Sequence, residues 1–434
     1  MTFVIVGIVL LLGLYMAWNI GANDVANSMA DAVGSGSISL KGAIIAAATC
    51  EFAGAVLVGS HVTDTVRRGI VSPESLAASP EALVLGMACA LLAAAVWLHI
   101  ATWMGMPVST THSIVGAVAG FGIIAAGWGA IHWGKMGQIV ASWFISPVAG
   151  GVMAFILFRL ISRLILGKET PLKAAVRITP WIVFLTAIVI TLATVYKGLQ
   201  HLIAEKATWL TGNVAILLSV AVGLISAVTA AILIRRYLEG KHGRPLGEKL
   251  DLVERIFAPL VVITSCCVAF AHGANDVANA IGPLAAVVDV VRSGTVKMKV
   301  HVPPWVLVMG GVGITLGLST YGYRVMRTVG TKITQITPTR GVAADVAAMT
   351  TVLVCTRLKL PVSTTHTLVG AILGIGLARG LGAVNLRVTR NIFSSWIVTV
   401  PVAAVLAVCL FLIGRLFLLE GLAEAIGSAA PGAG

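Results

Sequence analysis

Long apolar runs, separated by short polar stretches, recur along the whole chain. A helix needs roughly 17–25 apolar residues to cross the hydrocarbon core of a bilayer, and most of these runs are that long. They lack the strict alternation of a half-buried strand, so the pattern predicts membrane-spanning helices. Ten clear spans are predicted, near residues 2–20, 41–60, 82–103, 138–166, 180–196, 213–234, 253–271, 303–326, 342–357 and 391–419.

Two further apolar stretches, 107–128 and 361–378, differ from these spans. Each begins with a proline and is interrupted by glycines, which suggests a re-entrant segment or a half-helix. Together with the ten spans they predict an all-α polytopic membrane protein of about 12 transmembrane segments, including discontinuous or re-entrant half-helices.

The composition agrees with this prediction. Of the 434 residues, 58% are hydrophobic and 11% are charged, whereas a soluble domain carries about 25% charged residues. The net charge of +13 would suggest nucleic acid in a soluble protein, but the retention of Lys and Arg on the cytoplasmic side explains it in a membrane protein. We expect the lipid bilayer, and no nucleic acid, as a partner. The six cysteines show no metal-ligand spacing, and no cofactor is expected.

The basic residues predict the orientation of the chain. They gather in 159–177 and in 235–255, whereas the segment 197–212 between them contains only Lys197 and Lys206. Two predicted spans separate the basic stretches, so both stretches should lie on the same side of the membrane. The positive-inside rule makes that side cytoplasmic.

The chain also repeats itself. The sequence GANDVAN begins at Gly21 and Gly273, and PVSTTH begins 86 and 88 residues later, at Pro107 and Pro361. A Ser-Trp pair follows each PVSTTH, and the same anchors in the same order indicate a tandem duplication. The predicted units are a first repeat at 1–166, a central linker with two extra spans and a basic loop at 167–250, and a second repeat at 251–434.

GANDVAN predicts a cation site. Duplicated transporter halves typically meet near the bilayer midplane around broken helices, and the glycine after each apolar run is expected to interrupt the helix. Carboxylate and amide oxygens with little net charge suit a small alkali cation. Helix capping by the same side chains is the alternative, but ionisable groups at membrane depth usually mark functional sites. The predicted cation ligands are Asn23, Asp24, Asn27, Asn275, Asp276 and Asn279.

PVSTTH predicts an anion site. Proline suits the first turn of a helix, and the hydroxyls and backbone N–H groups that follow it gather at a positive helix start, where phosphate-like anions bind. The alternative is that these side chains bond back to carbonyls of their own helix. The candidate anion ligands are Ser109, Thr110, Thr111, Ser363, Thr364 and Thr365.

Three further side chains are candidate accessory groups. His112 and His366 end the two PVSTTH copies and are interpreted as donors behind the anion ligands. Glu51 is the other carboxylate expected inside a span, and the corresponding part of the second half, VMGGVGITLG, has no acid. Glu51 therefore breaks the symmetry, either as a group that gates or that binds a further cation or proton, or as a buried, protonated packing residue.

Duplicated cation and anion motifs indicate a cation-coupled anion symporter. A channel is an alternative, because rings of oxygens also line selectivity filters. A membrane enzyme acting on phosphate esters would need a cluster of metal-binding carboxylates or histidines, and none is visible in the sequence. We therefore expect a transporter and no enzyme.

The pairs GANDVANS/GANDVANA and PVSTTHS/PVSTTHT resemble those of the inorganic phosphate transporter (PiT) family over nearly the whole chain. The resemblance implies two inverted repeats, a frequent homodimer, and phosphate import with sodium or protons. It implies that the Ser-Thr-Thr runs hold inorganic phosphate and that cations bind near the Asn-Asp motifs. We expect sodium coupling, because the motifs offer amide and hydroxyl oxygens more than a titratable relay. Proton or metal-phosphate symport and sulfate transport stay open.

Overall fold

The computed structural model describes residues 2–59, 70–195, 212–241, 243–296, 302–357 and 362–427. Pro361, which begins the second PVSTTH, lies outside the described residues, as do Lys197 and Lys206.

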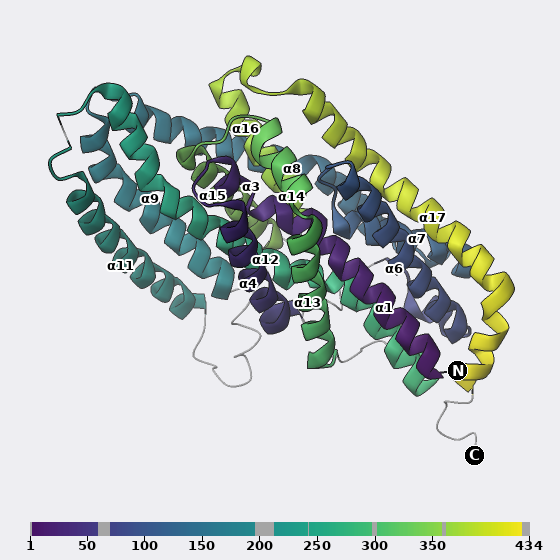
Figure 1. Ribbon diagram of the computed structural model, residues 1–434. Helices are drawn as coiled ribbons and strands as arrows, with labels where there is room; N and C mark the ends of the chain where they lie inside the picture. The colour runs from purple at the N-terminus through teal and green to yellow at the C-terminus, as the bar shows by residue number, and fades with distance from the viewer. Residues whose placement is uncertain are drawn as a thin grey trace.

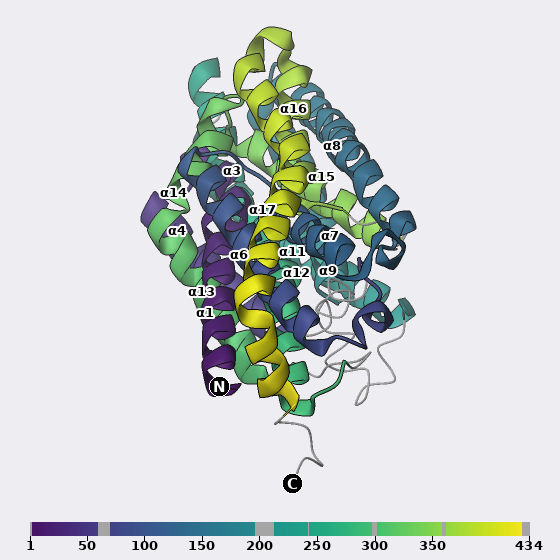
Figure 2. The ribbon, with the colours of Figure 1, turned by 90° about the vertical axis from the view of Figure 1, so that its right-hand side faces the viewer.

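The described chain is helical throughout its regular elements, apart from an isolated bridge between Val71 and Ile131. Figures 1 and 2 show the helices packed side by side as one elongated bundle. The longer α-helices are α1 (Thr2–Ile20), α4 (Leu40–Val58), α6 (Pro80–Trp103), α7 (Thr110–Ala126), α8 (Trp133–Ile161), α9 (Pro171–Thr194), α11 (Gly212–Leu238), α12 (Leu246–Ser293), α13 (Pro304–Tyr321), α15 (Pro338–Arg357), α16 (Thr364–Arg379) and α17 (Leu386–Gly427).

Short helical pieces join these helices. These pieces are η1 (Gly21–Val25), α2 (Ala26–Ser28), α3 (Ala30–Gly34), η3 (Pro73–Leu76), η4 (Trp128–Ala130), η5 (Ser162–Leu166), α14 (Tyr323–Arg327), η7 (Thr328–Lys332) and η8 (Leu381–Ala383).

The predicted spans correspond closely to these helices. Within the described residues, nine helices are long and apolar enough to cross a membrane, and each matches a predicted span. The tenth predicted span, 342–357, forms helix α15 but is not among the nine. Helix α15 carries Asp345 and the arginines Arg340 and Arg357 near its two ends, which lower its hydropathy. The all-α membrane fold is confirmed, whereas the count of twelve segments and the inversion of the repeats stay predictions.

The two proline-initiated stretches form short helices, as predicted. Helix α7 has 17 residues and α16 has 16. Ser109 and Ser363 are their N-caps, since each hydroxyl accepts a hydrogen bond from the backbone N–H three residues later. Each helix therefore begins directly after its cap serine, whose own backbone is extended.

The two copies of GANDVAN differ in backbone structure. In the first copy, α1 widens into the π-helical turn η1, which inserts an extra residue into the helical ladder. In the second copy, α12 continues as an α-helix of 48 residues through Gly273. The prediction that glycine interrupts the helix is therefore wrong for the second copy. A single glycine lowers helix stability by only about 1 kcal/mol, which packing on both sides of α12 offsets.

The halves of the chain pack crosswise. Helix α1 lies against α13 of the second half, and α12 lies against α4 of the first half. The short helices follow the same rule, because α7 packs on α17 and α16 packs on α8. Figure 2 shows α17 running past α6 and α7 along one side of the bundle. Each repeat is completed by helices of the other, so the site between them belongs to both.

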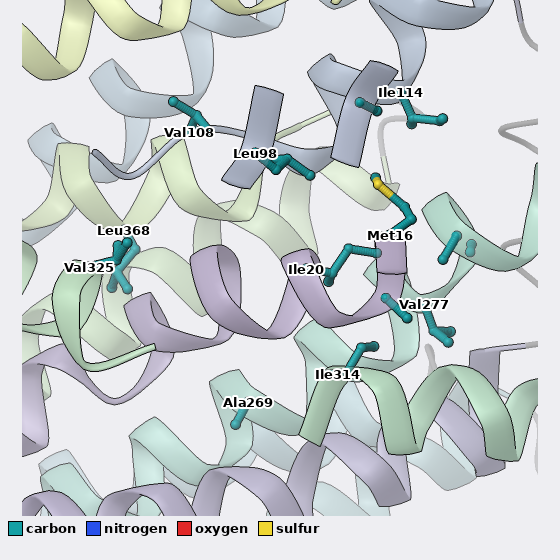
Figure 3. Packing of buried hydrophobic residues seen from close by; sticks show 14 of the residues in the cluster. Met16, Ile20, Leu98, Val108, Ile114, Ala269, Val277, Ile314, Val325 and Leu368 are labelled. Atoms are coloured by element: carbon teal, nitrogen blue, oxygen red, sulfur yellow. The ribbon is translucent and has the colours of Figure 1, made fainter. Parts of the chain in front are cut away.

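Glycines bring the GANDVAN segments onto these partner helices. A Cβ on Gly21 would lie 1.8 Å from the carbonyl oxygen of Ile314 on α13. A Cβ on Gly273 would lie 2.2 Å from the carbonyl oxygen of Glu51 on α4. Ile314 is therefore the structural counterpart of Glu51. Figure 3 shows Ile20 of α1 between Ile314 on α13 and Leu98 on α6.

Helices α9 and α11 form a pair at one side of the bundle, next to α12. They come from the predicted central linker. Lys173 near the start of α9 and Arg235 near the end of α11 line one surface hollow of about 460 Å³. The two basic stretches therefore lie at the same end of the molecule, as the charge pattern predicted.

Candidate functional site

The side chain of Asp24, in the π-helical turn η1, joins the two Ser-Thr-Thr runs. Its Oδ2 accepts hydrogen bonds from the hydroxyl of Thr110 at 2.6 Å and from the backbone N–H of Thr110 at 3.4 Å. Its Oδ1 accepts a hydrogen bond from the hydroxyl of Thr365, at the start of the other short helix. Asp24 is 2% exposed. One buried carboxylate thus holds the starts of α7 and α16 together.

Two asparagines extend this network. The Asn27 amide donates to the Thr365 hydroxyl at 3.3 Å. The Asn279 amide, from the second GANDVAN, donates to the hydroxyls of Thr110 at 3.1 Å and Thr111 at 3.0 Å. The carbonyl oxygen Oδ1 of Asn27 is buried without a hydrogen-bond donor among the described residues, which leaves it available as a cation ligand. We call Asp24, Asn27, Thr110, Thr111, Asn279 and Thr365 the central cluster.

The cap serines stand beside the central cluster. The hydroxyls of Ser109 and Ser363 accept from the backbone N–H groups of His112 and His366, both at 3.3 Å. Their own carbonyls accept from hydroxyls one turn later, of Ser113 and Thr367. The sequence left open that hydroxyls bond back to carbonyls of their own helix. Such bonds do occur, but their donors, Ser113 and Thr367, lie one turn after the cap serines and outside the Ser-Thr-Thr runs.

Asn23 faces away from the central cluster. Its amide donates to the hydroxyl of Thr102 at 2.9 Å and to the Met106 carbonyl at 3.0 Å, and its Oδ1 accepts from the Val108 backbone N–H at 3.0 Å. These bonds hold the segment that enters α7. The assignment of Asn23 as a sodium ligand stays a prediction, and its observed contacts position the first anion motif.

The second copy of the motif has a different arrangement. Asp276 lies 3.0 Å from Nδ1 of His272, and the same nitrogen lies 3.5 Å from the Thr364 hydroxyl. His272 thus stands between Asp276 and Thr364, where the first copy joins Asp24 directly to Thr110. Asn275 is half-buried. A cavity of about 30 Å³ reaches His272 and Thr364 between α12 and α15.

His272 is a site residue that the sequence analysis missed. The signal is the residue before each motif, since the first copy reads IGANDVAN and the second HGANDVAN. Ile20 occupies the corresponding position in α1 and is buried among apolar residues.

His112 and His366 meet behind the central cluster. Their ring centroids are 4.8 Å apart, with the rings nearly perpendicular. Trp396, from the second Ser-Trp pair, stacks on His366 at 3.8 Å and donates through its indole N–H to the carbonyl of Pro107. Trp143, from the first pair, lies against His112. The histidines therefore pack the starts of α7 and α16 against each other, directly after the threonines in sequence.

Glu51 lies on α4, against the second copy of the motif. It is 1% exposed, and neither carboxylate oxygen has a hydrogen-bond donor among the described residues. Its backbone carbonyl faces Gly273, three residues before Asp276. The sequence left open whether Glu51 is a functional carboxyl or a packing residue. The structure shows it as a buried acid near Asp276 that receives no hydrogen bond from the described residues.

The geometry gives the central cluster two kinds of ligand. The first turns of α7 and α16 present backbone N–H groups and threonine hydroxyls, which suit an oxyanion. The carboxylate of Asp24 and the amide oxygen of Asn27 suit a hard cation. Because the two sets share hydrogen bonds, a cation on Asp24 would lie next to an anion on the threonines.

Comparison with known proteins identifies the family. The model of the phosphate transporter family matches residues 20–407, most of the chain. This chain belongs to the phosphate transporter family. A protein of Pyrococcus abyssi with the provisional name phosphate permease is 46% identical over 402 residues, 93% of this chain and 96% of its own. The chloroplastic inorganic phosphate transporter 2-1 of Arabidopsis thaliana is 40% identical over 423 residues, 92% of this chain and 70% of its own.

A solved structure agrees with this assignment. The protein titled "The sodium-dependent phosphate transporter" is 41% identical, with a TM-score of 0.84 over 96% of this chain and 100% of the other. Membership of the phosphate transporter family therefore rests on both sequence and fold. It confirms the family resemblance drawn from the two duplicated motifs.

Proposed function

We propose that the protein is a secondary active transporter that imports inorganic phosphate together with sodium, by alternating access around the central cluster. The observation that carries the proposal is the position of Asp24, which accepts hydrogen bonds from the starts of both short helices. A cation bound there would neutralise charge next to an anion on the threonines.

In the proposal, phosphate binds to Ser109, Thr110, Thr111, Ser363, Thr364 and Thr365. Both short helices point their N-terminal dipoles at one place, which favours negative charge. A buried anion still needs countercharge, because the desolvation of an unpaired charge is prohibitive. Sodium on the Asn-Asp motifs supplies that countercharge.

The membrane potential explains why coupling is needed. Moving one charge through 100 mV is worth about 2.3 kcal/mol, so a dianion entering a negative cytoplasm meets a barrier of about twice that. Sodium ions that move with it cancel this term. Sodium is preferred over protons as the driving ion because the central ligands are mostly hydroxyls and amides. The related structure titled "The sodium-dependent phosphate transporter" supports the same choice.

The proposal also covers orientation and assembly. The end of the bundle with Lys173 and Arg235 would be cytoplasmic, because basic residues are retained on that side. Phosphate would therefore enter the central cluster from the opposite side. The family resemblance adds a homodimer to the proposal.

The test is labelled phosphate uptake into proteoliposomes, with sodium and pH gradients imposed separately. We expect phosphate to accumulate when sodium is high outside, and only to equilibrate when sodium is equal on both sides. Accumulation driven by a pH gradient without sodium would contradict sodium coupling. Inhibition by excess sulfate or by a metal chelator would favour sulfate or metal-phosphate transport, and accumulation itself would exclude a channel.

A further inference from the structure

Two buried carboxyl groups face each other outside the central cluster. Asp31 lies on α3, just after the first GANDVAN, and Asp345 lies on α15 of the second half. Both are 0% exposed, and their carboxyl groups lie within hydrogen-bonding reach of each other. Neither belongs to a motif that the proposed function uses.

The hydrogen bonds at this pair are unequal. Oδ2 of Asp345 accepts from the hydroxyls of Thr264 at 2.6 Å and Ser265 at 2.8 Å, both on α12. Oδ1 of Asp345 and both carboxylate oxygens of Asp31 have no donor among the described residues. Three buried carboxylate oxygens therefore receive no hydrogen bond, although the two carboxyl groups lie next to each other.

The other groups that face this pair do not supply a positive charge. The titratable neighbours are thiols, of Cys266 and Cys267 on α12 and of Cys50 on α4. Most charged and imidazole groups of the packed elements are exposed or bonded elsewhere in the described structure, and Glu51 on α4, which has no hydrogen-bond donor there, carries no positive charge. Lys332 and Arg327 are exposed. The other three arginines donate hydrogen bonds elsewhere, Arg324 to the Trp103 carbonyl, Arg340 to the Gln335 carbonyl and Arg379 to Thr334. Glu254 accepts from Thr339, His272 lies on Asp276, and His366 stacks on Trp396.

Two adjacent buried carboxyl groups cannot both be ionised, and sharing one proton removes the repulsion. The asymmetry of donors decides where the charge lies. Asp345 receives two hydroxyl hydrogen bonds and is the ionised member, whereas Asp31 receives none and is the member that carries the proton. An O–H of Asp31 would then donate to Asp345, which satisfies both groups.

A divalent metal ion fits this place less well than a proton. Calcium takes six to eight oxygen ligands and magnesium takes an octahedral set, whereas the pair offers two carboxylates and two hydroxyls, on segments whose carbonyls serve helical hydrogen bonds. The packing is also close, since a Cβ on Gly341 would lie 3.3 Å from Cβ of Asp31. A proton needs no coordination space.

We propose that Asp31 and Asp345 form a proton-binding site that holds one proton between the two halves of the chain. Ser265 precedes Asn279 of the central cluster by fourteen residues on α12, which is about 21 Å along a helix axis, so the two sites are separate on this helix. Losing the proton would place two like charges between α3 and α15. Phosphate uptake should therefore fall as pH rises through the loss of this proton, even when sodium drives transport.

Infrared difference spectroscopy of the purified protein in lipid tests the site without requiring transport, so it does not depend on the proposed function. We expect a carbonyl band of a protonated, buried carboxylic acid in the wild type that disappears in Asp31→Asn and in Asp345→Asn. Asp251→Asn, which changes an exposed carboxyl on α12, is the matched control and should keep the band. A band unchanged in both Asp31→Asn and Asp345→Asn would overturn the proposal.

Uptake measured against pH at saturating sodium tests the consequence. The titration of phosphate itself affects all variants alike, so the ratio of variant to wild type isolates the site. We expect the ratio for Asp31→Asn, which mimics the protonated acid, to rise about tenfold from neutral to alkaline pH, and the ratio for Asp251→Asn to stay constant. A constant ratio for Asp31→Asn would contradict the proposal.

Two further measurements complete the test. If Asp31→Asn does not insert, Thr264→Val, which removes one donor from Asp345, should shift the same infrared band, and an unshifted band would count against the proposal. A tenfold increase in the sodium concentration for half-maximal uptake in Asp31→Asn, with the infrared band unchanged, would mean that the pair binds sodium, which overturns the proton assignment.

Discussion

The same seven residues, GANDVAN, occur twice in this chain and make different contacts each time. In the first copy the helix widens at η1, and Asp24 accepts hydrogen bonds from threonines of both halves. In the second copy α12 stays regular, and Asp276 pairs with His272 on its own helix. The amide of Asn279 nevertheless reaches Thr110 and Thr111. Identical motifs therefore give one carboxylate that bridges the halves and one that does not.

The cause lies in the neighbours of each copy. Ile20 precedes the first motif and His272 the second, so only the second has an imidazole within reach of its aspartate. The partner helices differ as well, since Glu51 faces the second copy and Ile314 the first. The duplicated motifs thus form two similar local structures, and the few residues that differ between the halves give their aspartates different partners.

Asp24→Asn should have the largest effect. The change removes a buried charge that accepts from both half-helix starts, and hydrogen bonds to a charged group contribute about 1.5–3 kcal/mol each. We expect sodium-driven phosphate uptake to fall by at least about 100-fold, because each 1.4 kcal/mol is a factor of ten. Asp276→Asn should mainly raise the sodium requirement. Uptake at wild-type level in Asp24→Asn would contradict the cation assignment.

Gly21→Ala and Gly273→Ala should come next, with similar effects at both copies. The new methyl group would overlap a backbone carbonyl of α13 or α4, and overpacking of this kind costs about 1–3 kcal/mol. We expect a lower melting temperature and reduced uptake for both variants. Gly7→Ala, at a position with open space around it, is the control. A tolerated Gly273→Ala would mean that the packing of α12 on α4 is looser than described.

His272→Ile makes the second copy resemble the first. Asp276 loses its partner, so Thr364 becomes its nearest donor, as Thr110 is for Asp24. We expect the sodium concentration for half-maximal uptake to change by about tenfold, an effect of one hydrogen bond to a charged group. Ile20→Leu, the matching position in α1, should leave sodium dependence unchanged. Equal behaviour of the two variants would remove the distinction between the copies.

Ser109→Ala and Ser363→Ala should have the smallest effects. Each removes an N-cap, which is worth about 1 kcal/mol, and phosphate affinity should fall about fivefold in either variant. Isothermal titration with phosphate at fixed sodium measures this. Clearly unequal losses would show that the starts of α7 and α16 contribute differently to anion binding.

Much of the fold follows from the sequence because lipid imposes a simple rule, that apolar runs of sufficient length form spanning helices. The short helices were also predictable, from the proline and the hydroxyl-bearing residues at their starts. The regular course of α12 through Gly273 was not, since packing decides whether a glycine interrupts a helix. Whether each GANDVAN segment forms a π-helical turn or a regular α-helix is therefore decided by tertiary packing.

The candidate site follows the sequence in type but not in pairing. The motifs predicted which residues carry oxygens, yet no spacing indicates that Asn23 holds the segment before α7 or that Asp24 binds Thr365 of the other half. Such pairs are set by the crosswise packing of the repeats. His272 and the Asp31–Asp345 pair lie outside both motifs, so motif spacing alone could not identify them.

The most direct test of the central claim is an X-ray structure of the protein with arsenate and sodium, with the anion located by the anomalous signal of arsenic. The account predicts a peak between the first turns of α7 and α16, in contact with the hydroxyls of the Ser-Thr-Thr runs of both halves. A peak confined to one half, or none between the two helix starts, would contradict it.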